Sequence, residues 1–309
     1  MYKNEKFENY NSHLGEKAEK RSYKRFTLAL SVMSLFIFNS YASFAMNEEE
    51  EMRSHVKASY GAIAKSQKPC FSCSSKDCGD KEDKPSAKEY SMGLGYSEQE
   101  LEESVGADLG LGCGNPGAIA SLKEGEVVVD LGSGGGFDCF LAAKKVGSLG
   151  KVIGVDMTPD MIELARANAL KRNYTNVEFV LGEIENLPLS DSSADVIISN
   201  CVVNLSPNKE AVFREASRVL KRGGRLAISD IVTTTELPEE IKGNIELYTG
   251  CITGATKLDK LTSMMEAAGF GEINIDVKED SRSFISKWAP GSNAEDYIAS
   301  AYIYATKLQ

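Results

Sequence analysis

The chain has 309 residues, a formal net charge of −10 at pH 7 and 42% hydrophobic side chains. That length allows one large α/β domain with extensions or two modest domains, and the hydrophobic share argues against wholesale disorder. A net negative charge repels phosphate backbones, so no nucleic-acid partner is expected and a small substrate is favoured.

Residues 1–45 allow two interpretations. A basic pair at 24–25 precedes an apolar run over residues 26–38 and a closing Ser-Phe-Ala at 43–45. That order of basic, apolar and small residues is the pattern of a secretory signal or a short membrane anchor. In the alternative interpretation, the segment is a non-native extension ahead of a true start at Met46 or at the next methionine.

The next part of the chain follows an alternating order. Residues 46–92 are predicted to form a helix and a polar, cysteine-bearing loop. After them, the predicted strands are 127–131, 151–156, 177–181, 195–199 and 225–231, and the predicted helices are 137–146, 159–171 and 209–220. Five βα repeats specify a parallel, doubly wound α/β sheet, which we assign to a Rossmann-like domain over residues 93–235.

The last part of the chain follows a different order. Residues 238–248 and 258–268 are predicted helices, and residues 272–277 and 298–306 are predicted strands. We therefore predict a smaller C-terminal α+β extension over residues 236–309, which covers the active-site edge of the sheet.

The first predicted strand ends in a glycine-rich turn with the sequence DLGSGGGF, from Asp130 to Phe137. Glycines here let the backbone turn sharply and approach a ligand at the carboxyl edge of the sheet. A nicotinamide fingerprint needs G-x-G-x-x-G, but Phe137 stands where its last glycine would be, which disfavours a dehydrogenase. The spacing instead suits a ligand without a pyrophosphate, whose ammonium group can meet Asp130.

The next two strands supply further parts of a cofactor site. Asp156 ends the second strand, where its carboxylate can accept hydrogen bonds from both hydroxyls of a ribose. Met157 can then pack on an adenine ring. Gly182, Glu183 and Ile184 follow the third strand, where the acidic residue can take the exocyclic amine of adenine and Ile184 can cover the ring.

These edge positions, in this order, resemble the class I S-adenosylmethionine methyltransferases over about residues 125–235. The resemblance implies a class I, Rossmann-like methyltransferase fold with S-adenosylmethionine as methyl donor. The predicted cofactor-binding residues are Asp130, Gly132, Ser133, Gly134, Gly136, Asp156, Met157, Gly182, Glu183, Ile184 and Asn200.

Three of the seven cysteines are expected to converge near that cofactor. Cys113 precedes the first strand, Cys201 follows the fourth strand at its carboxyl end, and Cys251 lies between two predicted C-terminal helices. Three thiols make a soft site that selects soft acceptors. Trivalent arsenic takes three sulfurs and keeps a lone pair, which can attack a sulfonium methyl group without a general base.

A disulfide framework and a zinc site are less favoured roles for the cysteines. An odd number of cysteines in a Rossmann-like domain fits a secreted disulfide framework poorly. Zinc prefers four ligands, and the two histidines, His13 and His55, lie outside the predicted core. Cys139 is interpreted as a small buried hydrophobic residue, so it is left out of the site.

Six segments carry a closer resemblance: LGLGCGNP, DLGSGGGFDCFLAA, VIGVDMTPDMI, LGEIENLP, ISNCVVNLSP and LYTGCITGA. They are similar to the arsenite methyltransferases over about residues 55–275. The resemblance implies Cys113, Cys201 and Cys251 as arsenic ligands. Leu111 stands where algal and animal members carry tyrosine, so the match is to the shorter microbial form.

The same resemblance implies a redox partner in the N-terminal loop. One loop thiol would form a disulfide with Cys113 that reduces the oxidised, methylated arsenic, and thioredoxin or glutathione would then reset it. Cys70, Cys73 and Cys78 all compete for this role, because their spacing differs from the adjacent cysteine pair expected in the family. Cys78 is the preferred assignment.

The sequence therefore predicts an arsenite methyltransferase that detoxifies arsenic, supplied as arsenite or its glutathione conjugate. Two alternatives stay open. A class I methyltransferase acting on a quinone, a sterol or an amine would make the cysteines incidental, and a soft-metal-binding protein would not consume the cofactor. Because S-adenosylmethionine is made in the cytosol, we expect a cytoplasmic location, with membrane attachment through the N-terminal segment left open.

Overall fold

The computed structural model describes residues 49–66, 86–104, 106–242, 244–288 and 293–308. The apolar segment near the N-terminus and the cysteines Cys70, Cys73 and Cys78 lie outside these ranges. The chain divides into two compact units, Met1–Met52 and Arg53–Gln309, and the second contains all the strands and the helices α2 to α11 described below. No helix in the described ranges combines the length and the apolar character needed to cross a membrane.

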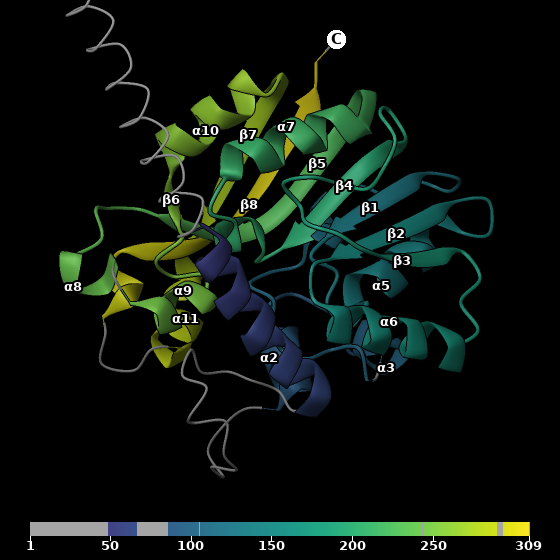
Figure 1. Cartoon of the computed structure of the whole chain (residues 1–309), viewed down its shortest axis with the longest axis horizontal. Coiled ribbons are helices and arrows are strands. Elements are labelled where there is room, and N and C mark those ends of the chain that lie inside the picture. Colours follow the sequence, from purple (N-terminus) through teal and green to yellow (C-terminus); the bar gives the residue numbers. More distant parts are fainter. Residues whose placement is uncertain (1–48, 67–85, 105, 243, 289–292, 309) are drawn as a thin grey trace, which may run out of the picture. The chain divides into compact units, whose positions relative to one another are not determined.

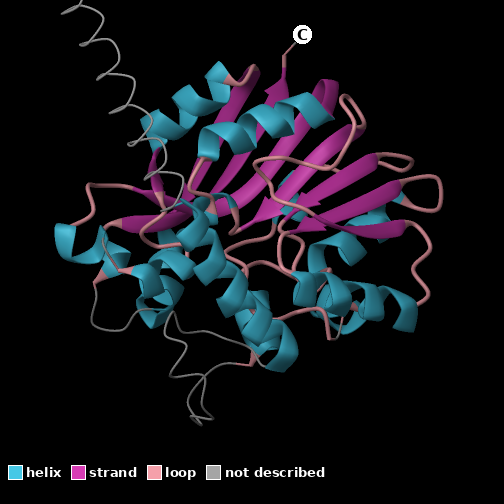
Figure 2. Ribbon diagram, in the orientation of Figure 1, coloured by secondary structure: helices cyan, strands magenta, loops and turns pink. Residues whose placement is uncertain are grey.

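One mixed sheet organises the second unit (Figure 1, Figure 2). Its strands lie in the order β3-β2-β1-β4-β5-β8-β7, and β6 pairs with β5 beside this row. Strands β1 to β5 pair in parallel, which confirms the predicted doubly wound arrangement. The bounds are β1 Val127–Leu131, β2 Lys151–Asp156, β3 Val177–Leu181, β4 Ala194–Asn200, β5 Leu220–Thr233, β6 Thr256–Lys257, β7 Phe270–Lys278 and β8 Ile298–Lys307.

Helices cover both faces of the sheet (Figure 2). A helix over residues 49–66 is followed by α2 Ala87–Gly93, α3 Glu98–Glu103, α4 Pro116–Ile119, α5 Phe137–Val146, α6 Pro159–Lys171, α7 Lys209–Val219, α8 Glu239–Lys242, α9 Ile245–Thr249, α10 Leu258–Ala267 and α11 Arg282–Trp288. Helices α5 and α6 confirm the predicted bounds. The predicted single helix at 238–248 is wrong in one respect, because the Asn244 side chain accepts a hydrogen bond from the Leu247 amide and starts a new helix, α9.

The two sheet faces form two separate apolar cores, because neighbouring residues of a strand point to opposite faces. In β1, Val128 packs with α5 and α6, whereas Val129 and Leu131 pack with α7 and α10. Both faces of the central strands are therefore covered, which explains why these strands read as uninterrupted apolar runs.

The C-terminal extension is not a separate layer, because its two long strands continue the main sheet. Strand β8 lies between β5 and β7 and runs antiparallel to both. The extension thus contributes β7 and β8 to the sheet and α8, α9 and α11 near its carboxyl edge (Figure 1).

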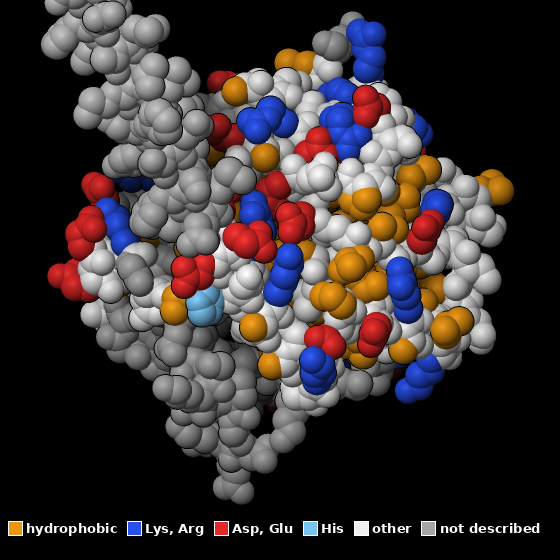
Figure 3. Space-filling view, in the orientation of Figure 1, with side chains coloured by type: hydrophobic (Ala, Val, Ile, Leu, Met, Phe, Trp, Pro, Cys, Tyr) orange, Lys and Arg blue, Asp and Glu red, His pale blue; other side chains and the backbone are white. Residues whose placement is uncertain are grey.

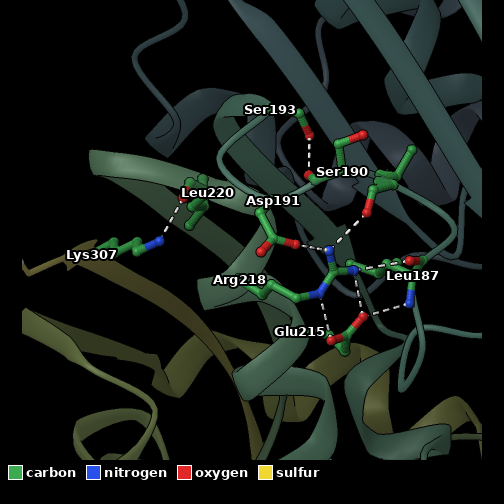
Figure 4. A network of polar contacts seen from close by, with 9 residues as sticks. Leu187, Ser190, Asp191, Ser193, Glu215, Arg218, Leu220 and Lys307 are labelled. Carbon is green, nitrogen blue, oxygen red and sulfur yellow. Dashed lines mark hydrogen bonds and ion pairs between the residues drawn. The ribbon is translucent and has the colours of Figure 1, made fainter.

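The loop between β3 and β4 is held by one arginine of α7, Arg218 (Figure 4). Its guanidinium donates to the backbone carbonyls of Leu187 and Leu189 at 3.0 and 2.8 Å and to the Asp191 carboxylate at 2.6 Å. Glu215 completes the clamp, since it accepts from the Arg218 guanidinium and from the Leu187 amide. This clamp fixes the loop that begins beside the predicted adenine site.

Candidate active site

The glycine-rich turn after β1 has the positive φ angles that favour glycine, 70° at Gly132, 51° at Gly134 and 92° at Gly136. Their surroundings differ. A Cβ atom on Gly132 would lie 2.4 Å from the Val202 side chain, and one on Gly136 would lie 2.7 Å from Phe179. A Cβ atom on Gly134 would meet nothing within 4 Å. The open side of the turn at Gly134 therefore faces space that a ligand can fill.

That space belongs to a cleft at the carboxyl edge of the sheet, with an empty volume of about 1050 Å³ including its mouth. This size suits a cofactor of drug-like dimensions. The predicted cofactor residues that line the cleft are Asp130, Gly132, Ser133, Gly134, Asp156, Met157, Ile184 and Asn200. The hydroxyl of Ser133 is buried and has no hydrogen-bond partner in the described part of the chain, so it can bond to a ligand.

Three predicted cofactor residues do not line the cleft: Gly136, Gly182 and Glu183. Gly136 packs against Phe179, and Gly182 packs against Pro188. The carboxylate of Glu183 instead forms an ion pair with Lys57 at 3.1 Å. Glu185, two residues further along, does line the cleft. On the molecular face drawn in Figure 3, acidic and basic side chains lie interspersed, in keeping with ion pairs of this kind.

Buried carboxylates give the cleft an acidic character. Burial raises the pKa of Asp130 well above its ordinary value, while the Cys139 thiol donates to its carboxylate at 3.1 Å. Burial also raises the pKa of Asp156, whose two oxygens accept from the amides of Thr158 and Gly134 at 2.8 and 2.9 Å. A cationic ligand would relieve the cost of burying these groups.

Sequence reasoning missed a polar group in the same cleft that centres on Asp138. Its carboxylate accepts from the Tyr96 hydroxyl at 2.6 Å and from the Asn200 amide at 3.0 Å, and burial raises its pKa to about 6. Asn200 also accepts from the Cys113 amide at 3.0 Å and donates to the Gly114 carbonyl at 2.9 Å. Asn200 therefore joins the cofactor cleft to the loop that carries Cys113.

The three predicted thiol ligands lie together in space, as their positions along the chain predict. Cys113, Cys201 and Cys251 are buried and free of disulfides. The sulfurs of Cys113 and Cys201 lie within 4.8 Å of each other, and the Cys251 thiol donates to the Cys201 backbone carbonyl at 2.9 Å. The two neighbouring thiols, followed by burial, raise the pKa of Cys201 well above its ordinary value. Cys201 also lines the cofactor cleft, so the thiol cluster opens onto it.

The loop with Cys113 is tied to the last strand. The Ser300 hydroxyl in β8 donates to the Cys113 carbonyl at 2.7 Å, and the Tyr302 hydroxyl accepts from the Asn115 amide at 3.2 Å. Burial raises the pKa of the Cys113 thiol to about 11, so this thiol is protonated at neutral pH. Cys139 lies elsewhere, beside Asp130, as its exclusion from the cluster predicts.

A buried carboxylate that sequence reasoning also missed, Asp230, lies beside the thiols. One of its oxygens and the sulfurs of Cys113 and Cys201 all lie within 4.8 Å of one another. Asp230 is only 2% exposed, and burial raises its pKa to about 6. The one signal in the sequence is an acidic residue within an otherwise apolar strand, LAISDIV.

The comparisons with known proteins fit this geometry. A family model described as a methyltransferase domain matches residues 122–269. The arsenite methyltransferase of Halobacterium salinarum is 47% identical over 270 residues, which cover 85% of this chain and 68% of that protein. This chain belongs to the arsenite methyltransferase family.

Other members of the family match a shorter stretch of the chain. The human arsenite methyltransferase is 40% identical over 168 residues, or 52% of this chain and 44% of the human protein. Among solved structures, an arsenic(III) S-adenosylmethionine methyltransferase from Chlamydomonas reinhardtii has a TM-score of 0.55 and 33% identity, and covers 73% of this chain and 74% of that chain. The methyl donor of this enzyme is S-adenosylmethionine. The cleft fits it through the open side of Gly134, a Ser133 hydroxyl that has no partner among the described residues, and acidic walls.

Proposed function

We propose that this protein transfers a methyl group from S-adenosylmethionine to trivalent arsenic bound by Cys113, Cys201 and Cys251. The observation that carries the proposal is the position of Cys201 between the other two cysteines and the cofactor cleft. Its sulfur lies within 4.8 Å of the Cys113 sulfur, its backbone carbonyl accepts from the Cys251 thiol at 2.9 Å, and the residue lines the cleft. Arsenic held by these thiols would therefore lie next to a methyl group in the cleft. Proximity of this kind supplies most of the rate when the donor is already activated.

The chemistry of loading the site needs no separate base. Arsenite carries three hydroxyl groups, and each thiol replaces one of them, so that each sulfur–arsenic bond forms as one water molecule leaves with the thiol proton. A glutathione conjugate would exchange in the same way and release glutathione. The thiols can stay protonated until the substrate arrives, which agrees with the raised pKa of Cys113.

Three groups of residues divide the work of binding and orientation. Asp130, Ser133 and Gly134 would hold the amino acid end of the cofactor, and Asp156 would meet the ribose. Met157 and Ile184 would enclose the adenine, and Glu185 lines the cleft whereas the predicted Glu183 does not. Residues 93–235 would thus hold the cofactor and supply Cys113 and Cys201, and residues 236–309 would supply Cys251.

Methyl transfer oxidises arsenic from the trivalent to the pentavalent state, because the lone pair becomes the new carbon–arsenic bond. A return to the trivalent state takes two electrons, which two thiols supply as they form a disulfide. We propose that Cys113 and one cysteine of the N-terminal loop, Cys78 in preference to Cys70 or Cys73, form it. Thioredoxin or glutathione would reduce it again, in a cytoplasmic setting.

The deciding experiment measures methylated arsenicals formed from arsenite, glutathione and S-adenosylmethionine. Native protein is compared with Cys201→Ser and with Cys139→Ser. The second variant is the control, because Cys139 is also buried but lies outside the thiol cluster, and a serine hydroxyl can still donate to Asp130. Product from the native protein and from Cys139→Ser, with none from Cys201→Ser, supports the proposal. Folded, cofactor-binding native protein that makes no methylated arsenical would contradict it, and would favour the alternative of another small acceptor.

A further inference from the structure

The pocket of the three thiols also contains an oxygen ligand for which arsenic has no need. Arsenic uses three sulfurs, yet a carboxylate oxygen of Asp230 lies within 4.8 Å of the sulfurs of both Cys113 and Cys201. In a tetrahedral zinc site the ligand atoms lie about 3.5–4 Å apart, given metal–sulfur bonds of about 2.3 Å. The distances between the three atoms therefore need to shorten by at most about 1.3 Å for the atoms to ligate a divalent cation.

The Asp230 carboxylate is fixed in a position suited to ligation. Its Oδ1 atom accepts from the Asn204 side chain at 2.8 Å and from the Ile231 amide at 2.8 Å, and its Oδ2 atom accepts from the Asn204 amide at 3.2 Å. Partners of this kind orient metal-ligating carboxylates and strengthen binding. No described side chain with a positive charge forms an ion pair with Asp230 at short range, so a cation can still approach it.

The charges in the pocket balance for either ligand. Three thiolates neutralise trivalent arsenic by themselves. The negative charge of Asp230 is then offset by the positive charge of Lys209, which attracts it. With a divalent cation on two thiolates and one carboxylate, the complex carries a single negative charge, and Lys209 offsets it. The buried site can therefore hold either species without a large uncompensated charge.

We propose that this pocket binds a thiophilic divalent cation, Zn²⁺ or Cd²⁺, through Cys113, Cys201 and Asp230, and that the bound cation excludes arsenite. Binding replaces the proton of each thiol with a metal–sulfur bond and releases that proton to the buffer, while the ionised carboxylate supplies the third ligand. Cys251 or a water molecule completes the tetrahedron. The exclusion of arsenite rests on the proposed function, but the binding of the cation does not.

The test uses the full chain with Cys70→Ser, Cys73→Ser and Cys78→Ser, because those thiols would bind the probe as well. Cd²⁺ is titrated in the presence of a phosphine reductant, and the ultraviolet charge-transfer absorption of cadmium thiolate is recorded. Arsenite is then added as competitor. The expected result is saturation at a single equivalent of Cd²⁺ and loss of the absorption as arsenite displaces the cation.

Asp230→Asn separates the two ligands. It should weaken Cd²⁺ binding by ~10-fold or more, because it removes the oxygen ligand, while arsenite binding changes by less than ~3-fold. Asp276→Asn is the matched control, since Asp276 is an exposed carboxylate paired with Lys278 on β7. Retained binding of S-adenosylhomocysteine shows that each variant is folded. Equal Cd²⁺ affinity in folded Asp230→Asn and in the parent would overturn the assignment of Asp230.

A second measurement tests the proposal without the Asp230→Asn substitution. The zinc-edge X-ray absorption spectrum of the Zn²⁺-loaded parent should show oxygen and sulfur in the first shell, and a shell of sulfur alone would overturn it. The proposal would also be overturned if the parent protein binds Cd²⁺ and arsenite separately but arsenite does not displace the bound Cd²⁺. If Cd²⁺ binds as described but native protein forms no methylated arsenical, only the proposed function fails.

Discussion

The thiol of Cys251 donates a hydrogen bond to the backbone carbonyl of Cys201 over 2.9 Å, and both residues adopt positive φ angles, 64° and 59°. Left-handed backbone at residues other than glycine costs on the order of 1–3 kcal/mol and persists where the surrounding structure enforces it. Two members of one thiol cluster share this conformation. The backbone strain therefore lies at the residues that we propose to hold the substrate.

Glycine and alanine at position 201 should reverse their usual order of stability. Each variant loses the thiol, but glycine tolerates a φ angle of 59° whereas alanine does not. We expect Cys201→Gly to exceed Cys201→Ala in free energy of unfolding by about 1 kcal/mol, and both to lack arsenite methylation. Urea unfolding of the two variants checks this, and a more stable alanine variant would show that position 201 is unstrained.

Gly132 and Gly134 should respond differently to substitution by alanine. A Cβ atom at 132 meets Val202 at 2.4 Å, so Gly132→Ala should lose several kcal/mol of stability, roughly 3 or more. A Cβ atom at 134 meets no protein atom within 4 Å, so Gly134→Ala should lose only about 1 kcal/mol from backbone strain. Its main effect should be weaker binding of S-adenosylmethionine.

Calorimetric titration with S-adenosylhomocysteine and urea unfolding of both variants separate these effects. Undiminished cofactor affinity in Gly134→Ala would mean that the ligand does not approach the turn at this residue.

The titration of Asp138 should lower the free energy of unfolding as the pH rises. Burial raises its pKa from 3.8 to about 6, so the folded state binds a proton that the unfolded state releases. The contribution of Asp138 to the free energy of unfolding is therefore largest below pH 3.8 and falls as the pH rises to about 6, by on the order of 3 kcal/mol. Above that range the contribution is constant.

The measurement compares urea unfolding of native protein and Asp138→Asn between about pH 5 and about pH 8. The native protein should lose stability relative to the variant as the pH rises, chiefly in the acidic half of that interval. A difference that stays constant or grows in favour of the native protein would mean that Asp138 titrates near its ordinary value.

Asn200→Ala should act on the arsenic side of the reaction more than on the cofactor side. It leaves the Cys113 amide and the Gly114 carbonyl without their partner, and each such loss costs about 1–3 kcal/mol in a buried site. We expect KM for arsenite to rise by ~10-fold while KM for S-adenosylmethionine changes by less than ~3-fold.

Ser199→Ala is the matched control, because it removes a buried hydrogen bond to the Leu131 carbonyl without reaching the Cys113 loop. It should lower stability and leave both KM values near those of the native protein. The reverse pattern in Asn200→Ala, with KM raised for the cofactor alone, would identify Asn200 as a cofactor ligand, as the sequence predicts.

The elements that could be predicted from the sequence are those whose signal is local. Strands β1 and β2 are buried on both faces, so they read as apolar runs, and helix α6 begins with a proline at its first turn. The glycine turn and the three cysteines stand at strand ends or loops that parallel topology brings to one edge. Position along the chain was therefore enough to predict that the cysteines converge.

Pairings between distant side chains could not be predicted in this way. Glu183 and Glu185 follow the same strand, and the structure alone shows that Glu185 lines the cleft while Glu183 pairs with Lys57. Asp138 and Asp230 lie within a helix and a strand, where an acidic residue is ordinarily a solvated surface residue. Their burial depends on partners far along the chain, Asn200 and Asn204, which local pattern cannot reveal.

The hydrogen bond from Ser300 to the Cys113 carbonyl joins residues 187 positions apart in the chain. Ser300 belongs to β8, which is inserted in the sheet between β5 and β7, two strands that precede it in sequence. A growing polypeptide that has already completed β1 to β5 still lacks the strand that ties down the first thiol loop. During synthesis the cofactor cleft can therefore take shape before the loop of Cys113 is fixed beside the other thiols. A chain that still lacks β8 therefore also lacks the contacts of Ser300 and Tyr302 that fix the loop of Cys113.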